Sequence, residues 1–380
     1  MQPRKKLLLF TEYFPISEEA EFTGGVESRF FYIVKELSAI QDITVICSRQ
    51  PEQKKDSVVC GARVLRVGPA TPYSNKGFVV RRSLTALLML FKGIAQKSDI
   101  VEGASFMSYV PAFLTGVFLR AQARATWHET WLGEWIQHKG FVTGMLGEIW
   151  ERIALKFHWD MIITVSDFTE QKLIAYKPYF KQITHTLPNG IDYELLSQLS
   201  VTKHKKPTIM TFGRLSQQKD VQTLIRAIKI LSKDIPEVQC NIIGDGPARA
   251  ELEQLTKELG LQNRVNFLGK KVKYKDHITA AKQCHVYCSP SLLEGFGITL
   301  IEAMALGLPY AVTRIPAFVE VTNNGKGGFL FEPQQPEELA RQLRTLLTDR
   351  KLYSFKAKEA QALAQTYSWT RLIKQSSFLR

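Results

Sequence analysis

The stretch SPSLLEGFGITLIEAMALGLP, residues 289–309, places two carboxylates, Glu294 and Glu302, on either side of a glycine-broken turn. On one continuous helix these side chains would point about 80° apart, because each residue rotates by about 100°. The glycines indicate instead a loop followed by a short helix, beginning near residue 298 or 299 and ending at Gly307. Glu294 is then expected in the loop and Glu302 about one turn inside the helix, on either side of its positive end.

Short apolar runs rich in Val, Ile and Leu alternate with amphipathic stretches along the whole chain. Runs that predict strands occupy residues 6–10, 43–47, 63–67, 99–103, 161–166, 208–213, 239–246, 265–269 and 285–290. Stretches that predict helices occupy residues 27–38, 81–97, 220–233, 248–259 and 275–283. This alternation is typical of parallel sheets covered by helices on both faces. The sequence therefore predicts an α/β fold of doubly wound, Rossmann-like sheets.

The chain has 380 residues, which is more than one typical hydrophobic core serves and suits two domains. A polar and basic segment, LLSQLSVTKHKKP at 195–207, is the candidate linker. We expect one domain at 1–197 and a second at 204–359, with a last helix at about 360–380 packed back onto the first. Ligands of such sheets bind beyond the carboxyl ends of the strands, so two facing domains would hold a ligand in the cleft between them.

The composition is that of an ordinary globular protein, 45% hydrophobic and 23% charged, with a formal net charge of +14. A basic surplus suits nucleic acid, anionic lipid or a phosphorylated small ligand. The densest basic cluster, within residues 270–275, is too short for a nucleic-acid-binding arm, so we expect no nucleic-acid partner. Apolar runs such as residues 84–91 are far shorter than the roughly 20 residues that cross a bilayer. The protein is expected to be cytoplasmic and soluble, or at most to lie on a membrane.

Five cysteines are dispersed through apolar segments, which predicts reduced thiols in the core of a cytoplasmic protein. Two of them flank His285 in CHVYCSP, residues 284–290, but no second ligand pair follows at metal spacing. This segment is therefore interpreted as a buried strand. The N-terminus has only four consecutive apolar residues before Thr11, which indicates a first strand and not a signal peptide.

Four glycine-marked turns stand where predicted strands end: TGG at 23–25, FGR at 212–214, GDGP at 244–247 and EGFG at 294–297. Glycine lets backbone N–H groups approach an anion, and a following helix adds partial positive charge. Arg214 and Lys219 follow the second turn and could neutralise a diphosphate. Each charge-assisted hydrogen bond contributes about 1.5–3 kcal/mol, more than the about 0.3–1 kcal/mol of a helix end. For Lys219 alone, a solvated surface cation is an equal alternative.

Several motifs together resemble the retaining GT-B glycosyltransferases of glycosyltransferase family 4, the glycogen-synthase-like family. The second half matches through FGRLSQQKD, IIGDGPARAELEQL, VNFLGK and the stretch from residue 289 to 313, which holds the E-x7-E signature as Glu294 and Glu302. The first half matches more loosely through TGGVE, WHET, VSDFT and LPNGID. The resemblance implies a GT-B fold and a retaining hexosyltransferase. It would move a sugar from a UDP- or GDP-linked donor to a hydroxyl of a glycan or lipid-linked acceptor held by the first domain.

The resemblance also assigns site residues. His128 and Glu294 would be catalytic and face the transferred sugar, and Glu302 would accept hydrogen bonds from the two ribose hydroxyls. The donor-binding set is Gly24, Gly25, Arg214, Lys219, Gly244, Gly246, Lys270, Gly295, Phe296, Gly297, Ile298, Thr299 and Glu302. No Asp-x-Asp triplet occurs in the chain, so we expect neither a metal nor a cofactor. The family usually has glycine after the lysine, where this chain has Asp220, interpreted as a cap of the next helix.

Some features keep two interpretations. Trp127, Trp131 and Trp135 recur at four-residue spacing, either as a helical stripe packed in the core or as a platform for the acceptor. Residues 81–97 and 139–159 pair cations with broad apolar faces, which suits packing inside the first domain or contact with an anionic membrane. At the level of function, a non-catalytic sugar-nucleotide-binding protein or a GT-B epimerase or phosphorylase are the alternatives.

Overall fold

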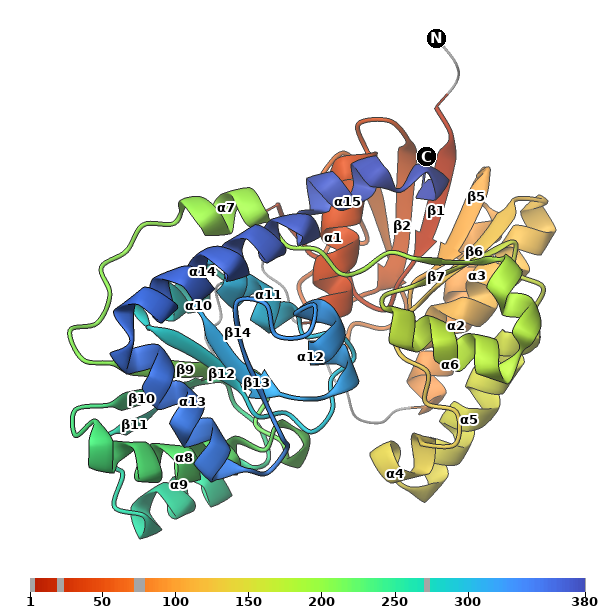
Figure 1. Ribbon diagram of the computed structural model, residues 1–380. Helices are drawn as coiled ribbons and strands as arrows, with labels where there is room; N and C mark the ends of the chain where they lie inside the picture. Colours follow the sequence, from red (N-terminus) through yellow and green to blue (C-terminus); the bar gives the residue numbers. More distant parts are fainter. Residues whose placement is uncertain (1–3, 19–23, 72–78, 270–273, 380) are drawn as a thin grey trace. The chain divides into compact units, whose positions relative to one another are not determined.

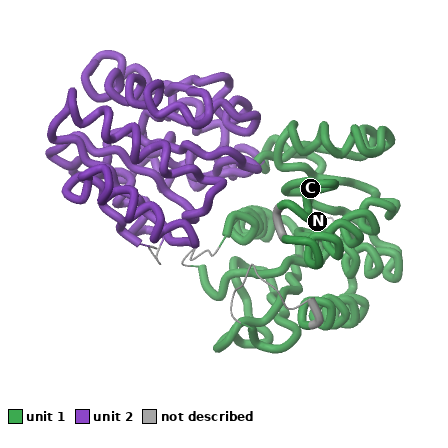
Figure 2. Tube along the Cα trace, turned by 90° about the horizontal axis from the view of Figure 1, so that it is seen from below, with its two compact units in different colours: residues 1–188, 373–380 green, residues 189–372 purple. Residues whose placement is uncertain are grey.

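The computed structural model describes residues 4–18, 24–71, 79–269 and 274–379. The chain divides into two compact units, drawn in different colours in Figure 2. Unit 1 consists of residues 1–188 and 373–380, and unit 2 consists of residues 189–372. The polar segment 195–207 lies inside unit 2, so the passage between the units differs from the predicted linker. In the structure its first residues complete helix α7, with Leu196 buried, and the rest, residues 199–207, connects α7 to strand β9 and is mostly polar.

Unit 1 is built on a sheet of eight strands in the order β3-β4-β2-β1-β5-β6-β7-β8, in which only β3 is antiparallel to its neighbour. The strands are β1 (Lys6–Phe10), β2 (Asp42–Ser48), β3 (Asp56–Val59), β4 (Ala62–Val67), β5 (Ile100–Gly103), β6 (Gln122–Trp127), β7 (Met161–Thr164) and β8 (Thr184–Thr186). The helices are α1 (Gly25–Leu37), α2 (Val79–Ile94), α3 (Phe106–Leu119), α4 (Trp135–Lys139), α5 (Phe141–Lys156), α6 (Asp167–Tyr176) and the 3₁₀ helix η1 (Pro178–Gln182).

The connections of unit 1 fix which face each helix covers. Helix α1 joins β1 to β2, whereas α2, α3, α5 and α6 join strands in the opposite direction along the sheet. Because crossovers between parallel strands are right-handed, α1 covers one face and the other four cover the opposite face. Figure 1 shows helices on both faces of the sheet. The strands between the two layers are almost fully buried, as the apolar runs predict.

Unit 2 holds a parallel sheet of six strands in the order β11-β10-β9-β12-β13-β14. The strands are β9 (Thr208–Phe212), β10 (Gln239–Ile243), β11 (Val265–Gly269), β12 (Val286–Ser289), β13 (Tyr310–Thr313) and β14 (Gly328–Phe331). The helices are α7 (Tyr193–Gln198), α8 (Val221–Asp234), α9 (Arg249–Glu258), α10 (Tyr274–Gln283), α11 (Ile298–Ala305), α12 (Pro316–Val321), α13 (Pro336–Thr348) and α14 (Arg350–Ala364), with the 3₁₀ helices η2 (Gln217–Lys219) and η3 (Gln365–Tyr367).

The C-terminal helix α15 (Trp369–Gln375) crosses from unit 2 to unit 1, followed by the 3₁₀ helix η4 (Ser377–Leu379). Gln41 donates a hydrogen bond from its side-chain nitrogen to the Leu379 carbonyl at 2.8 Å. The ring of Phe378 stacks on His185 with centroids 4.8 Å apart. These contacts attach the last residues to unit 1.

The fold class predicted from the sequence, two doubly wound α/β sheets, is confirmed. The helix expected after residue 297 is α11, which ends before Gly307 as predicted. CHVYCSP contains the buried strand β12, and Cys47, Cys240, Cys284 and Cys288 are buried free thiols, while Cys60 is half-buried. In the described part of the chain, no helix is long and apolar enough to span a bilayer.

Candidate functional site

The carboxyl edge of the unit 2 sheet brings Lys219 and Glu294 into an ion pair. Lys219 ends η2, which follows β9, and Glu294 lies in the loop between β12 and α11. Ser291 donates a second hydrogen bond to the same Glu294 oxygen, Oε1, at 2.9 Å. The backbone N–H of Leu292 donates to the Gln218 carbonyl at 2.8 Å and joins the two loops. The carboxylate is thus held in place by a cation and a hydroxyl from separate segments.

Helix α11 begins at Ile298, four residues after Glu294. Gly297 is its N-cap, with φ +95°, a conformation that glycine adopts without strain. A Cβ at this position would lie 2.7 Å from the Phe318 ring, so the turn also needs the space. Phe296 is buried in the core and offers a ligand only its backbone, while the Thr299 hydroxyl hydrogen-bonds the Tyr287 hydroxyl at 2.9 Å. The first N–H groups of α11 therefore form a positive end shortly after Glu294 in the chain.

Glu302, inside α11, is hydrogen-bonded by one side chain of α10 and lies close to a second. The hydroxyl of Tyr274 donates to Glu302 Oε1 at 2.9 Å, and His277 Nε2 lies 3.6 Å from Oε2. The His277 ring itself stacks on Phe212, at the end of β9, with centroids 4.2 Å apart. The sequence analysis identified Glu302 but neither Tyr274 nor His277, because their role depends on α10 lying next to α11.

The glycines after β9 and β10 let two loops touch. Gly213 has φ +146° and Gly244 has φ +145°, and a Cβ on Gly244 would overlap the carbonyl oxygen of Gly213. A Cβ on Gly246 would likewise overlap the Leu215 carbonyl. Leu215 in turn donates its N–H to the Asp245 carbonyl at 3.0 Å. Gly244 and Gly246, which the resemblance assigns to donor binding, thus have a packing role that suffices to require glycine.

Of the two remaining cations predicted to bind the donor, Arg214 and Lys270, the structure describes only Arg214. The Arg214 side chain is exposed at the carboxyl edge, immediately after Gly213. Lys270 lies outside the described residues. Gly295 is half-buried between Glu294 and Phe296, and Ile298 is half-buried in the first turn of α11. Apart from Lys270, all donor-binding residues assigned to the second half therefore lie at the carboxyl edge of one sheet.

Asp220 stands at the N-cap position of α8, as predicted, but caps it indirectly. Its carboxylate accepts a hydrogen bond from the Thr223 hydroxyl at 2.6 Å and makes no side-chain bond to the helix backbone. Its φ is +43°, in the left-handed region. Glycine adopts this region most easily, which explains on physical grounds why glycine suits the position after Lys219.

In unit 1, the loop after β1 and the end of β6 supply the predicted residues. Gly24 is the N-cap of α1 and Gly25 its first residue, with no side-chain cap, so the first N–H groups of α1 are not covered by a capping side chain. His128 follows β6, and its Nε2 lies 3.0 Å from the Ala104 carbonyl. Because a carbonyl only accepts, the neutral ring carries its proton on Nε2 and leaves Nδ1 as an acceptor.

Arg29 and Glu102 are buried residues of opposite charge in the surroundings of His128, and the sequence analysis did not recognise them. Arg29 of α1 is 1% exposed and Glu102 of β5 is 5% exposed. Arg29 donates to the Pro188 carbonyl at 3.1 Å, and Glu102 accepts from the Thr126 hydroxyl at 2.7 Å. Burial raises the pKa of Glu102, whereas burial lowers the pKa of Arg29 to about 9 against the opposing charge of Glu102. The sequence offered one signal for these two residues. Arg29 and Glu102 are charged residues that stand among apolar residues, in a predicted helix and a predicted strand.

These surroundings keep His128 neutral. Burial, with a smaller contribution from the Arg29 charge, lowers the pKa of His128 from 6.5 to about 3. Its ring meets Phe30 edge to face, with centroids 6.0 Å apart. A neutral imidazole at working pH can accept a hydrogen bond from a sugar hydroxyl through Nδ1 without carrying charge to the reaction.

The lowered pKa of His128 predicts a pH-dependent stability. Between pH about 4 and 6.5 the unfolded chain binds a proton at this position that the folded chain does not bind. The free energy of unfolding should therefore fall as the pH is lowered through this window. Urea unfolding of wild type and His128→Asn between pH 4 and 7 should give slopes against pH that differ by about one proton. Parallel slopes would contradict the assignment.

The three tryptophans do not form one helical stripe, so that interpretation is wrong. Trp127 ends β6, Trp131 lies in the following turn and Trp135 begins α4. The indoles of Trp127 and Trp135 both donate to the buried Glu151 carboxylate, at 3.3 and 2.6 Å. Core packing is therefore confirmed for these two. Trp131 is half-buried, donates to Glu129 and packs against Trp135, and for it the acceptor-platform interpretation stays a prediction.

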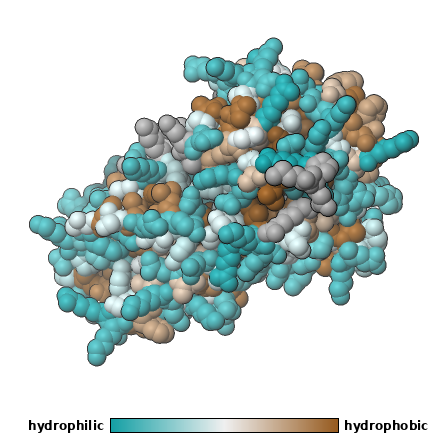
Figure 3. Space-filling model, turned by 90° about the horizontal axis from the view of Figure 1, so that it is seen from above, coloured by the Kyte–Doolittle hydropathy of each residue, from teal (hydrophilic) through white to brown (hydrophobic). Residues whose placement is uncertain are grey.

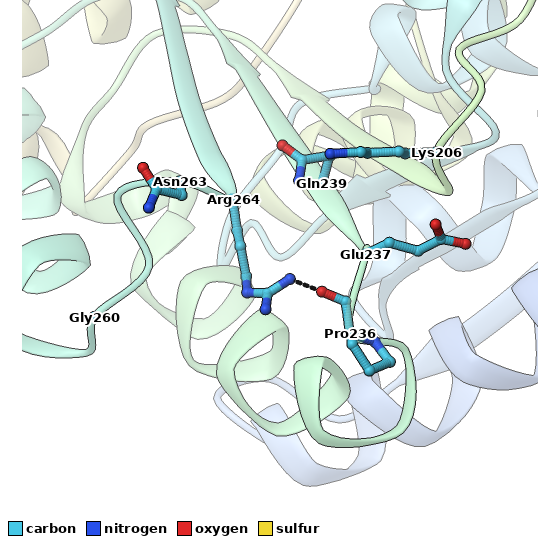
Figure 4. Close-up of a pocket in the computed structure, with 7 residues that line it drawn as sticks. All are labelled: Lys206, Pro236, Glu237, Gln239, Gly260, Asn263 and Arg264. Atoms are coloured by element: carbon cyan, nitrogen blue, oxygen red, sulfur yellow. Dashed lines mark hydrogen bonds between the residues drawn. The ribbon is translucent and has the colours of Figure 1, made fainter.

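A surface hollow of unit 2 lies away from these residues. Figure 4 shows its lining, from segments at the amino ends of β9, β10 and β11: Lys206, Pro236, Glu237, Gln239, Gly260, Asn263 and Arg264. Arg264 is already bound to the Pro236 carbonyl. Since ligands of parallel sheets bind at the carboxyl ends, we place the functional site at the other edge. Among the described residues, no group of three His, Cys, Asp or Glu side chains could hold a metal ion.

Comparison with known proteins agrees with this geometry. Residues 23–195 match the family model described as Glycosyltransferase Family 4, and residues 193–363 match the model described as Glycosyl transferases group 1. The chain belongs to the family 4 glycosyltransferases. The first model covers the loop and helix that carry Gly24 and Gly25, together with His128, and the second covers Lys219, Glu294 and Glu302. The glycosyltransferase class predicted from the motifs is thus confirmed.

Individual relatives of this glycosyltransferase are distant. An uncharacterized glycosyltransferase of Haemophilus influenzae is 28% identical over 57% of this chain and 60% of its own length. The sulfoquinovosyl transferase SQD2 of Arabidopsis thaliana is 25% identical over 96% of this chain and 71% of its own length. The Anabaena protein HepE, solved with UDP and glucose, superposes with a TM-score of 0.74 at 21% identity, covering 98% of each chain. At this identity the structural match supports the fold alone.

Proposed function

We propose that this protein is a retaining, metal-independent hexosyltransferase that moves a sugar from a UDP-linked donor to a hydroxyl of a glycan or lipid-linked acceptor. The Anabaena HepE protein, which shares the fold, was solved with UDP and with UDP-glucose, so we take UDP as the nucleotide to test first. Breaking the bond between the sugar and the diphosphate of a nucleotide-diphospho-sugar leaves one additional negative charge on the leaving nucleoside diphosphate, which must be stabilised. Preorganised positive groups are the means by which a protein stabilises such charge.

The observation that carries the proposal is the ion pair of Lys219 with Glu294, four residues before the start of α11. A donor binding here would place its diphosphate on Lys219, Arg214 and the first N–H groups of α11. Lys219 would then exchange part of its contact with Glu294 for phosphate oxygens. Glu294, still held by Ser291, would face the sugar hydroxyls. The donor has an uncharged sugar and a negatively charged diphosphate. The Glu294 carboxylate can accept hydrogen bonds from the sugar hydroxyls, and the positive end of α11 can bind the diphosphate.

Further residues would bind the ribose, the transferred sugar and the phosphates of the donor. Glu302, held by Tyr274 and next to His277, would accept hydrogen bonds from the ribose 2′- and 3′-hydroxyls. From unit 1, His128 would accept a hydrogen bond from the sugar through Nδ1, and Gly24 and Gly25 would offer backbone N–H groups to phosphate. A protein that only binds sugar nucleotides would also use Arg214 and Lys219 for the diphosphate, so measured sugar transfer decides between that alternative and an enzyme. An epimerase or phosphorylase would not be expected to need the spacing of Glu294 and Glu302.

The ribose contact gives a direct test of donor binding. Wild-type protein should bind UDP about tenfold or more tightly than 2′-deoxy-UDP, because a hydrogen bond to a carboxylate contributes about 1.5–3 kcal/mol. Glu302→Ala should weaken UDP and abolish this discrimination, measured by titration calorimetry. Lys206→Ala, at the opposite edge of the sheet, is the control and should behave as wild type. Equal binding of both nucleotides by wild type would contradict the role of Glu302.

The same protein tests the reaction. Incubation with a UDP-hexose and an acceptor should release UDP, with the same rate after removal of divalent ions by a chelator. The anomeric configuration of the product, read by NMR, should equal that of the donor. Loss of turnover with chelator would overturn metal independence, and epimerised donor without UDP release would support the epimerase alternative.

A further inference from the structure

One face of unit 1 carries an unusual amount of exposed apolar surface. Helices α2, α3 and α5 cover the same face of its sheet, as their connections require, and α3 contacts both α2 and α5. Side chains of these helices that are exposed therefore point away from the sheet. We call their outer surface the α2–α3–α5 face. Apolar side chains also interrupt the mostly hydrophilic surface in Figure 3.

The exposed apolar side chains follow helical stripes. On α2 they recur at three- and four-residue spacing, and α3 and α5 repeat the pattern, so each helix is apolar on both its inner and its outer side. Phe91 is 57% exposed, Phe118 66% and Phe141 69%. Among the side chains that the structure describes, the set is Leu84, Leu87, Leu88, Phe91, Leu114, Val117, Phe118, Phe141, Val142, Met145, Leu146, Ile149 and Ile153. Packing inside unit 1 accounts for the inner sides of these helices and leaves this set uncovered.

The charged residues of α2 are all cations, of which Arg82 pairs with Glu12, and α3 carries no charge. No Asp or Glu occurs in residues 79–98 or in residues 104–128, which include α2 and α3. Exposed cations border the apolar set: Arg81, Lys92, Lys97, Arg120 and Lys156. On α5, Glu151 is buried and Glu148 pairs with Arg152. An occupant of this face must therefore be apolar at the centre and negatively charged at the rim.

We propose that the α2–α3–α5 face docks on an anionic lipid bilayer, with the apolar side chains inserted among the acyl chains and the cations at the headgroups. Apolar insertion and attraction to anionic lipid together give peripheral binding. A second copy of the chain would present the same positive rim, and the two rims would repel one another. A bilayer instead supplies both the apolar layer and the negative charge.

Helices α3 and α5 of this face begin at the same edge of the sheet as His128. Helices α3 and α5 follow β5 and β6, so their N-terminal ends stand at the carboxyl edge of the sheet, where β6 delivers His128. Phe141 and Val142 begin α5 at that edge. A bilayer on the face would therefore approach the His128 end of unit 1. This geometry favours a lipid-linked acceptor, a refinement that rests on the proposed function, whereas vesicle binding itself does not.

Vesicle flotation tests the docking without donor or acceptor. Wild-type protein should float with phosphatidylcholine vesicles that contain about one third phosphatidylglycerol, and much less with phosphatidylcholine alone. Raising NaCl from about 0.1 to about 0.5 M should weaken the binding, because screening reduces the attraction to anionic lipid. The double variant Phe91→Ser/Phe118→Ser should lower the partition coefficient about tenfold or more.

The matched control is Phe355→Ser on α14 of unit 2, since Phe355 is also 57% exposed. It should bind vesicles like wild type, and thermal unfolding followed by circular dichroism should show all variants folded. Absence of wild-type binding, binding unchanged in the double variant, or equal loss in Phe355→Ser would each overturn the proposal. So would a wild-type dimer, seen by sedimentation, that the double variant converts to monomer. UDP release from a UDP-hexose with a water-soluble acceptor stays a separate measurement, so the docking can fail while the proposed reaction holds.

Discussion

Replacing Glu294 by glutamine is expected to lower kcat/KM for sugar transfer about 100- to 1000-fold, the usual effect of removing one preorganised electrostatic group. The amide keeps the size of the side chain and can still accept from Ser291, but it cannot hold a charge next to Lys219. Lys219 then loses its competing partner. Binding of UDP alone should stay as tight as in wild type or become tighter, which separates this effect from a collapsed site.

The measurement is initial-rate kinetics of UDP release together with calorimetric titration of UDP. Glu337→Gln, an exposed glutamate in the first turn of α13, is the matched control and should transfer sugar at the wild-type rate. Near-normal turnover by Glu294→Gln would mean that the carboxylate only positions Lys219. Loss of UDP binding together with turnover would mean that Glu294 organises the loop and does not act on the sugar.

Gly244→Ala is expected to destabilise unit 2 by about 2–6 kcal/mol, the sum of about 1–3 kcal/mol for backbone strain and about 1–3 kcal/mol for overpacking. The residue combines φ +145° with a direct approach to the Gly213 carbonyl, so alanine requires the loops after β9 and β10 to separate. Those loops carry Arg214 and lead to Lys219. Donor binding should therefore weaken as well.

Gly260→Ala supplies the comparison. Gly260 also has a positive φ, +67°, but nothing lies within 4 Å of a Cβ placed there. Gly260→Ala should lower the free energy of unfolding by only about 1–2 kcal/mol, the strain of the left-handed backbone conformation. Urea unfolding of the two variants distinguishes the contributions. Equal midpoints would show that the close approach of the two loops carries no energy and that the need for glycine at residue 244 lies in ligand contact.

Strands and helices with a clear apolar pattern were predicted from the sequence, and those without one were missed. Strands β9, β10 and β12 are apolar runs followed by turn residues, and they were identified with nearly correct bounds. Strand β6, QARATW, was missed because its polar side chains break the apolar run, although Arg124 is buried and bonded to Gln122. Helix α3 was missed because it is apolar all round and contains a proline, which hides the helical period.

The site was predictable where its chemistry is local and unpredictable where it depends on packing. Glu294, Glu302 and Lys219 stand in continuous motifs. Tyr274 and His277 reach Glu302 from another helix, and no spacing along the chain encodes that contact. The exposed α2–α3–α5 face is a similar case. The sequence showed apolar stretches with cations, but only the structure separates side chains that face the sheet from those that face outward.

The central claim is that the diphosphate of a UDP-linked sugar binds at the carboxyl edge of the unit 2 sheet. Determining a crystal structure after soaking with UDP tests it most directly. The account predicts the diphosphate on Lys219, Arg214 and the first N–H groups of α11, with the ribose hydroxyls on Glu302. Nucleotide bound instead at the amino edge, in the hollow beside Lys206 and Arg264, would contradict the claim.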